Sequence, residues 1–270
     1  MKFAQSSAVY FNYSLSYAIK DLGEFGYDGI EIWGGRPHMF KNDLDYDLDQ
    51  LKMIIKEFNM DVCNFIPAQF RYPSILCSRN EVVRKDSISY IKSAIDNARK
   101  IGSPSVSLCP GMVLFDEDLD TGWKNLIGSF KEIEEYAKDK NILLLIEPAH
   151  RFETNLIRTI EDCLKMLEIL DSEFFGILID TGHCYINGEE FKEVLPKCKD
   201  FPLHFHIDDN FGEADLHLIP GEGSIDFEDF YRALESIDYK GYISVELGTS
   251  YIMDPYNACK KSIKVLKDMF

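Results

Sequence analysis

Four residues that can bind a metal ion or transfer a proton stand at the ends of short apolar segments. A carboxylate at the edge of an apolar core is costly unless a partner compensates its charge. Each of these residues therefore either forms an ion pair or has a chemical role. The four residues are Glu147, Asp180, His206 and Glu246.

Three carboxylates cannot all stay ionised in a small volume without a cation. With one imidazole they form an oxygen-rich ligand set, which suits Mn²⁺, with Mg²⁺, Co²⁺ and Fe²⁺ as alternatives. For any single residue, a separate ion pair with a lysine or arginine is the simpler interpretation. Because all four occupy equivalent positions in successive segments, we expect them to share one divalent metal ion.

The segments that carry these residues belong to a regular alternation along the chain. Short apolar runs alternate with amphipathic stretches such as 82–102 and 227–237, where apolar residues recur every three or four positions. Gly26 and Gly102 end two of these expected helices, as suits a left-handed cap. The expected strands are 2–9, 29–33, 61–66, 105–109, 142–147, 175–180, 203–208 and 242–247.

This alternation is the βα pattern of a parallel sheet. Eight units in roughly 250 residues predict a closed (β/α)8 TIM barrel, which we expect to form a single domain over residues 1–270. A doubly wound open sheet is the alternative, but it usually has fewer strands, and no GxGxxG follows the first segment. Catalytic groups of such barrels project from the C-terminal ends of the strands, and the four residues above stand there.

Two of the expected ligands have a further role in this arrangement. Strands five and eight lie nearly opposite each other in an eight-stranded barrel, so Glu147 and Glu246 can flank a bound substrate. A metal ion polarises a carbonyl group, and a carboxylate then removes the neighbouring hydrogen as a general base. Return of a proton to the same carbon from the other side gives epimerisation, and return to the adjacent carbon gives aldose–ketose isomerisation. The residues support both outcomes.

Other polar residues follow the same strand ends. His183, on the loop after 175–180, can hydrogen-bond a sugar oxygen, and Glu153 can bind a hydroxyl group or orient a neighbour. A surface histidine and an acid at a helix N-terminus are the respective alternatives. His217 lies on the long loop after 203–208. His204 is expected to be a hydrogen-bonded core residue, and His150 has no assigned role.

Composition excludes several classes of partner. The net charge of −17 argues against nucleic acid or an anionic membrane, because both are bound through excess lysine and arginine. No stretch approaches about 18 consecutive apolar residues, so no transmembrane helix is expected. The first residues lack the apolar region of a signal peptide. Seven cysteines, never spaced CxxC, indicate reduced thiols in a cytoplasmic protein.

Several motifs give the chain a family resemblance. EFGYDGIEIWGGRPHMF (24–40) and DLHLIPGEG (215–223) are similar to fructoselysine 3-epimerases, whereas EPAHRFETNL (147–156) and DTGH (180–183) are similar to D-tagatose and D-psicose 3-epimerases. The chain therefore resembles the sugar 3-epimerases among the xylose isomerase-like TIM barrels over essentially its whole length.

The resemblance implies a metal-dependent isomerase that is a homo-oligomer and acts on a small sugar. It implies Mn²⁺ held by the four residues named first, with Glu147 and Glu246 as the acid/base pair and Glu153 and His183 as substrate-binding residues. His217 stands where the epimerases of free ketoses carry arginine, which favours a larger ketose derivative such as a ketosamine.

Other activities known on this barrel remain open from the sequence. An inosose dehydratase-type lyase and a hydroxypyruvate-like aldose–ketose isomerase need similar metal chemistry. A phosphodiesterase of the endonuclease IV type needs more histidines than the six present and a basic groove, which the charge of −17 disfavours. A sugar-binding barrel without catalysis is the remaining alternative.

Overall fold

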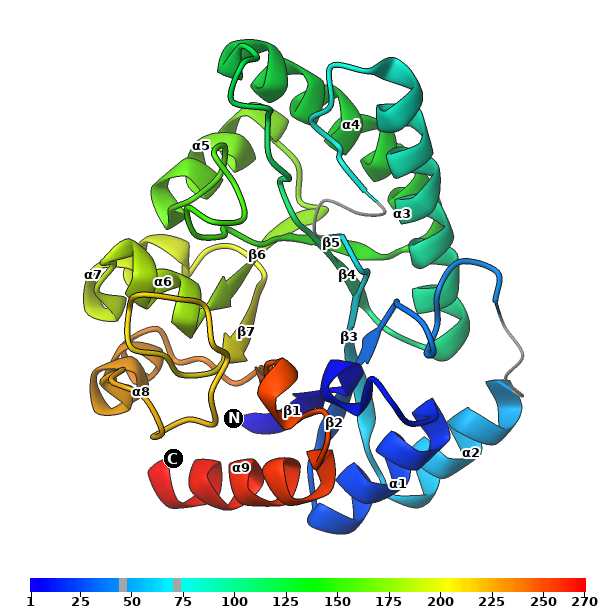
Figure 1. The fold of residues 1–270 in the computed structure, drawn as a ribbon, viewed down its shortest axis with the longest axis vertical. Helices are drawn as coiled ribbons and strands as arrows, with labels where there is room; N and C mark the ends of the chain where they lie inside the picture. The colour runs from blue at the N-terminus through cyan, green and yellow to red at the C-terminus, as the bar shows by residue number, and fades with distance from the viewer. Residues whose placement is uncertain (44–47, 70–73) are drawn as a thin grey trace.

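The structure is a computed structural model of the chain, and it describes residues 1–43, 48–69 and 74–270. Eight parallel strands, each hydrogen-bonded to the next, form a closed barrel in chain order, with β8 paired to β1 (Figure 1). The predicted (β/α)8 barrel is confirmed, and the doubly wound alternative is wrong. The strands are β1 (Lys2–Ser6), β2 (Gly29–Trp33), β3 (Asp61–Ile66), β4 (Ser105–Leu108), β5 (Leu143–Ile146), β6 (Phe175–Asp180), β7 (Leu203–Ile207) and β8 (Tyr242–Val245).

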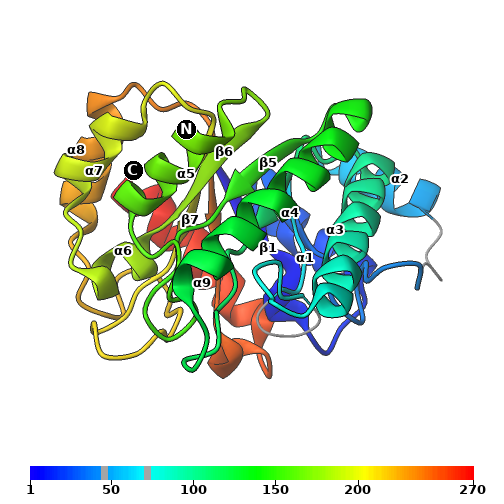
Figure 2. The ribbon, with the colours of Figure 1, turned by 90° about the horizontal axis from the view of Figure 1, so that it is seen from above.

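Helices surround the barrel, and Figure 2 shows α7 and α8 at one side of the strands and α2 and α3 at the other. The last helix, α9, packs beside α1 and so completes the ring (Figure 1). The helices are α1 (Leu15–Phe25), α2 (Leu48–Glu57), α3 (Glu81–Ile101), α4 (Leu119–Lys140), α5 (Ile160–Leu170), α6 (Thr181–Asn187), α7 (Phe191–Cys198), α8 (Phe227–Ser236) and α9 (Pro255–Met269), with short 3-10 helices at Ser7–Tyr10 and Thr249–Tyr251. Of the helices in the described ranges, none combines the length and the hydropathy that a membrane span requires.

Two helix ends follow the glycines that the sequence singles out, and a third helix begins at a side-chain cap. Gly26 and Gly102 cap α1 and α3 with φ of 81° and 91°, a conformation that costs glycine little because it lacks a Cβ atom. The side chain of Asp226 caps α8 by accepting hydrogen bonds from the backbone N–H groups of Glu228 and Asp229. These short-range signals fix where each connection turns back to the barrel.

Side chains in each strand alternate between the helix layer and the inside of the barrel. In β2, Ile30 and Ile32 belong to the apolar core, and burial of each stabilises the fold by about 1.5–3 kcal/mol. Glu31, between them, is fully buried and accepts a hydrogen bond of 2.6 Å from Asn64 of β3. The apolar layer under the helices therefore supplies stability, while the inside of the barrel holds polar groups.

Candidate metal centre and active site

The four residues predicted as metal ligands lie together at the C-terminal end of the barrel. One ligand atom from each lies within 4.8 Å of the others. Asp180 ends β6 and His206 belongs to β7, whereas Glu147 and Glu246 come directly after β5 and β8. The backbone N–H groups of both glutamates donate to carbonyl groups of the preceding strand, at 3.0 and 3.3 Å. The barrel thus holds all four residues rigidly.

One imidazole nitrogen faces the three carboxylates. Nδ1 of His206 lies 2.8 Å from Oε2 of Glu246, 3.4 Å from Oε1 of Glu147 and 3.8 Å from Oδ2 of Asp180. Neither this nitrogen nor Oδ2 of Asp180 has a hydrogen-bond partner in the described part of the chain, although both atoms are buried. Buried polar atoms without partners need an explanation, and a divalent cation among these four side chains provides one.

The charges of this cluster lead to the same conclusion. Burial alone would lower the pKa of His206, but Glu31 and Glu246 raise it well above its ordinary value. Burial alone would raise the pKa of Glu246, but His206 holds it below its ordinary value. The carboxylates therefore create a strong preference for positive charge at this point, and a divalent metal ion satisfies that preference. The residues present fit the predicted ligand set.

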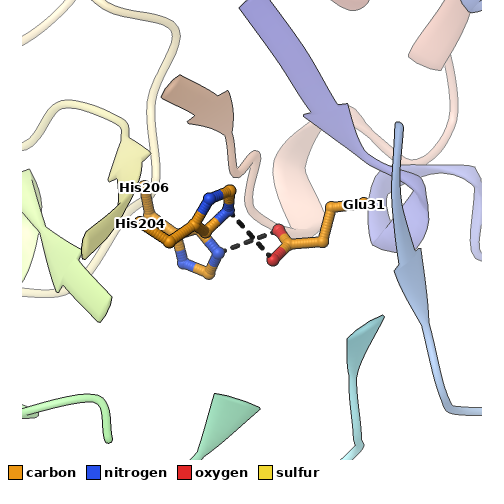
Figure 3. Close-up of side chains that lie close together, drawn as sticks. All are labelled: Glu31, His204 and His206. Atoms are coloured by element: carbon orange, nitrogen blue, oxygen red, sulfur yellow. Dashed lines mark hydrogen bonds and ion pairs between the residues drawn. The ribbon is translucent and has the colours of Figure 1, made fainter. Parts of the chain in front are cut away.

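Glu31, His204 and His206 form a second cluster of buried side chains (Figure 3). Oε2 of Glu31 lies 2.8 Å from Nε2 of His206, on the side of the ring opposite to the carboxylate cluster. Nε2 of His204 lies 3.4 Å from Oε1 of the same glutamate. His204 is buried, as predicted, but its Nε2 has no hydrogen-bond partner among the described residues, whereas a hydrogen-bonded residue was expected. Sequence reasoning assigned no role to Glu31, although an acid in the middle of the apolar segment GIEIW was a signal.

Three histidines surround Asp215, which lies on the loop between β7 and α8. Oδ2 of Asp215 lies 2.8 Å from Nε2 of His217, 3.0 Å from Nε2 of His150 and 3.7 Å from Nε2 of His183. Nδ1 of His217 forms a short contact with Asp208, so both of its ring nitrogens face carboxylates. Neither Asp215 nor the role of His150 was found from the sequence.

The placement of His183 requires a correction. It lies in the first turns of α6 and is buried, not on a loop, because Asp180 caps that helix by accepting a hydrogen bond of 2.8 Å from the His183 backbone N–H. Its Nδ1 donates to the carbonyl oxygen of Pro148 at 3.1 Å. Because Nδ1 is engaged in this bond, Nε2 faces Asp215 and Glu153, and the distance to Glu153 is 3.9 Å.

A cavity of about 280 Å³ opens above the metal centre. The three residues predicted to bind substrate all line it, together with the two glutamates of the acid/base pair and Trp33: Glu147, Glu153, His183, His217, Glu246 and Trp33. Within the described residues, its lining includes no lysine or arginine. Arg151, four residues after Glu147, donates to the carbonyl of Ile186 at 3.4 Å. The cavity is therefore acidic.

Asp209 holds the loop that carries His217. Its carboxylate accepts hydrogen bonds from the backbone N–H groups of Gly221, Gly223 and Ile225, at 2.9, 2.7 and 3.0 Å. In the PGEG segment the N–H groups of Gly221 and Gly223 thus bind a carboxylate of the protein and that of Glu222 binds the carbonyl of Ile219, so none of them is available to a phosphate group. A fixed loop gives His217 a fixed position over the cavity.

Comparison with known proteins agrees with this site. Residues 19–269 match the family described as xylose isomerase-like TIM barrel. Fructoselysine 3-epimerase of Shigella flexneri is 31% identical over 242 residues, which cover 89% of this chain and 88% of that protein. Inosose dehydratase of Clostridium perfringens (strain ATCC 13124) is 27% identical over 164 residues, 54% of each chain.

A solved structure is similar over the whole length. The crystal structure of a D-tagatose 3-epimerase-like protein has a TM-score of 0.80 and 26% sequence identity, covering 99% of both chains. Two of these relatives carry the names of epimerases, which are isomerases, and this agrees with the enzyme class predicted from the sequence. By its family match and by its 31% identity to fructoselysine 3-epimerase, the chain belongs to the xylose isomerase-like TIM barrel family.

Proposed function

We propose that this protein is a metal-dependent epimerase that inverts the carbon next to the carbonyl group of a ketose or ketosamine. The observation that carries the proposal is the convergence of Glu147, Asp180, His206 and Glu246 within 4.8 Å at the mouth of the barrel. Two of these four groups also line the cavity, where they can reach both a metal ion and a substrate.

The same four residues are the proposed metal ligands. Three carboxylates and one imidazole favour Mn²⁺, with Mg²⁺, Co²⁺ and Fe²⁺ as alternatives. When bound, the cation polarises the carbonyl group of the substrate and stabilises the negative charge that develops on its oxygen. Asp180 and His206, both buried, serve only to hold the metal ion in this proposal.

Glu147 and Glu246 exchange protons with the substrate. One glutamate removes the hydrogen from the carbon next to the carbonyl, and the other delivers a proton to the same carbon from the opposite face. The thiol of Cys109 lies beside Glu147, with Sγ 3.5 Å from Oε2. Burial and the charge of Glu147 raise the pKa of Cys109 well above its ordinary value. The thiol therefore stays protonated and donates to the carboxylate.

Glu153, His183 and His217 are the proposed substrate contacts. Burial alone would lower the pKa of His217, but Asp208 and Asp215 raise it well above its ordinary value. His217 is therefore a cation, as the arginine of free-ketose epimerases would be, but it is shorter. The shorter side chain and the acidic lining favour an unphosphorylated ketose derivative, and an amine-bearing ketosamine such as fructoselysine suits both features.

Proton exchange in D₂O tests this function. The protein is loaded with Mn²⁺ and incubated with fructose, tagatose or fructoselysine, and deuterium at C3 is followed by NMR. We expect deuterium incorporation and the C3 epimer from at least one substrate. The absence of both from every ketose and ketosamine in the panel would contradict the proposal.

Dehydration is the second candidate, favoured by the similarity to inosose dehydratase. The same base would remove the hydrogen, but the hydroxyl group on the next carbon would then leave as water. A new enone absorbance with an inosose substrate would identify this outcome. Appearance of an aldose from a ketose would instead identify an isomerase of the hydroxypyruvate type.

A further inference from the structure

Glu31 stands in the centre of a chain of hydrogen bonds that crosses the inside of the barrel. The hydroxyl of Ser105 donates to Oδ1 of Asn64 at 2.7 Å, and Nδ2 of Asn64 donates to Oε1 of Glu31 at 2.6 Å. The other oxygen of Glu31 accepts from the hydroxyl of Ser244 at 3.2 Å and faces Nε2 of His206 at 2.8 Å. All five side chains are buried, so bulk solvent does not reach them.

The carboxylate of Glu31 keeps a hydrogen on Nε2 of His206. A carboxylate only accepts hydrogen bonds, so Nε2, at 2.8 Å from Oε2 of Glu31, must be the N–H group. Nδ1 faces the carboxylates of Glu246, Glu147 and Asp180, so it carries a second hydrogen in the metal-free protein and would present its lone pair when a metal ion replaces that hydrogen. The opposite tautomer would keep the hydrogen on Nδ1, directed at Glu246, 2.8 Å away, where the metal ion has to bind.

We propose that Glu31 is a positioning residue for the metal centre, which selects the metal-binding tautomer and the ring orientation of His206 by accepting its Nε2–H. Figure 3 shows the carboxylate of Glu31 directed from β2 toward the two histidines of β7. The inference rests on the proposed function, because it takes His206 to be a metal ligand. It adds a residue that touches neither the metal ion nor the substrate.

Substitution of Glu31 by glutamine reverses the hydrogen bond. Nδ2 of Asn64 requires an acceptor at the position of Oε1, so the amide oxygen of glutamine takes that place. The amide NH₂ then faces Nε2 of His206 and donates to it, which puts the ring hydrogen on Nδ1. Partners of metal-bound histidines contribute about 10–100-fold to metal affinity, so we expect Glu31→Gln to weaken Mn²⁺ binding by that factor.

A compensating change restores the acceptor. In the double variant Glu31→Gln/Asn64→Asp, the aspartate accepts both from Ser105 and from the amide NH₂ of glutamine. The amide oxygen then faces Nε2 of His206 again. We expect the affinity of the double variant for Mn²⁺ to lie within a few fold of that of the unchanged protein. Its loss of affinity should thus be roughly a tenth or less of the loss in the single variant. Ser244→Ala, which removes a donor to the same oxygen of Glu31 but leaves its contact with His206, is the matched control.

Calorimetric titration of the metal-free protein with MnCl₂ decides between the outcomes, and thermal unfolding of each metal-free variant measures its folding. A weak single variant and a restored double variant support the proposal. Unchanged affinity in Glu31→Gln, or equal losses in both variants, would overturn it. If the single variant does not fold, the proposal still requires the double variant to bind Mn²⁺. Failure of the unchanged protein to bind any of Mn²⁺, Mg²⁺ or Co²⁺ would refute the proposed function itself, which is a different result.

Discussion

Oδ2 of Asp215 lies 2.8 Å from Nε2 of His217, and the same oxygen faces two further histidines. One carboxylate thus holds the group of imidazoles beside the cavity. Burial alone would raise the pKa of Asp215, but the three histidines, with His217 first, hold it well below its ordinary value. Asp215 therefore stays ionised and holds His217 and His183, two of the residues proposed above as substrate contacts.

Asp215→Asn tests this arrangement. The amide keeps the size of the side chain but loses the charge that holds the histidines. Hydrogen bonds to charged groups contribute about 1.5–3 kcal/mol, so we expect kcat/KM of the epimerisation to fall by about 10–100-fold. Affinity for Mn²⁺ should not change, because Asp215 is not one of the proposed ligands.

The matched control for this change is Asp200→Asn, at an exposed position in the turn after α7. Steady-state kinetics and Mn²⁺ titration are measured on both variants. Loss of Mn²⁺ affinity in Asp215→Asn as large as in Asp180→Asn would show that Asp215 belongs to the metal centre and not to the substrate contacts.

Glu147→Gln and Glu246→Gln test which glutamate transfers a proton on each face of the substrate. Glutamine keeps the shape of the side chain but cannot take up a proton, and general acid–base groups contribute about 10²–10⁴-fold to a rate. We expect each variant to lose epimerisation by that factor at saturating Mn²⁺. Each should still exchange deuterium into the one epimer whose hydrogen faces the remaining glutamate. NMR of both epimers in D₂O measures this selectivity.

Glu132→Gln provides the control, because the Glu132 side chain is exposed and pairs with Lys92 at 2.8 Å, between two helices on the outside of the barrel. This change should leave exchange into both epimers intact. Full epimerisation in either active-site variant would show that the glutamate concerned transfers no proton.

Removal of the metal ion should destabilise the protein. Glu147, Asp180 and Glu246 approach one imidazole nitrogen within 3.8 Å, and without a cation their charges repel one another. A ligand at 100 times its Kd stabilises a fold by about 2.7 kcal/mol. We therefore expect the melting temperature to rise with Mn²⁺ concentration and to fall after treatment with a chelator.

The comparison protein for the thermal shift is Asp180→Asn, which removes one proposed ligand. Its melting temperature should respond to Mn²⁺ only at higher concentrations. A melting temperature of the unchanged protein that does not depend on Mn²⁺, Mg²⁺ or Co²⁺ would count against a metal centre at this place.

The barrel fold and the position of the four proposed ligands could be predicted from the sequence, because both depend on short-range patterns along the chain. Apolar runs such as 142–146 mark buried strands, and parallel strands bring their C-terminal ends to one edge. A polar residue that ends such a run, as Asp180 does, is therefore placed without knowledge of any contact. This is why the four proposed ligands could be named before their distances were known.

Contacts between segments far apart in the sequence could not be predicted from such patterns. Glu31 meets His206 across 175 positions of the chain, and a bulge between Ile30 and Glu31 sets its register against Asn64. Asp215 meets three histidines from a loop whose later part is held by Asp209. His183 was expected on a loop because the capping role of Asp180 was not recognised. Periodicity predicts which face a residue occupies, but not its partner on that face.

His38 gives the protein a pH dependence that is independent of the metal centre. Burial lowers the pKa of His38 from its ordinary 6.5 to about 4. Its Nε2–H donates to the carbonyl of Tyr13 at 3.1 Å, and its Nδ1 accepts from the hydroxyl of Ser7 at 3.2 Å. Ser7 in turn accepts from the backbone N–H of Trp33 at 2.9 Å. This network fits the neutral imidazole, in which one ring nitrogen donates and the other accepts.

Stability should therefore fall as the pH decreases through this range. The unfolded chain binds a proton at His38 below about pH 6.5, whereas the folded chain does so only near pH 4. Between these values the unfolded state binds more protons, so the free energy of unfolding decreases with falling pH. A shift of this size corresponds to about 3 kcal/mol, and the loss is complete near pH 4.

His38→Gln isolates this contribution, because glutamine can donate to Tyr13 but does not titrate. Urea unfolding of both proteins is measured at several pH values between about 7 and 4, with a chelator present so that metal release adds nothing. We expect the unchanged protein to lose about 3 kcal/mol more than the variant over this range. Parallel stability curves for the two proteins would show that His38 takes up its proton in the folded state as readily as in the unfolded chain.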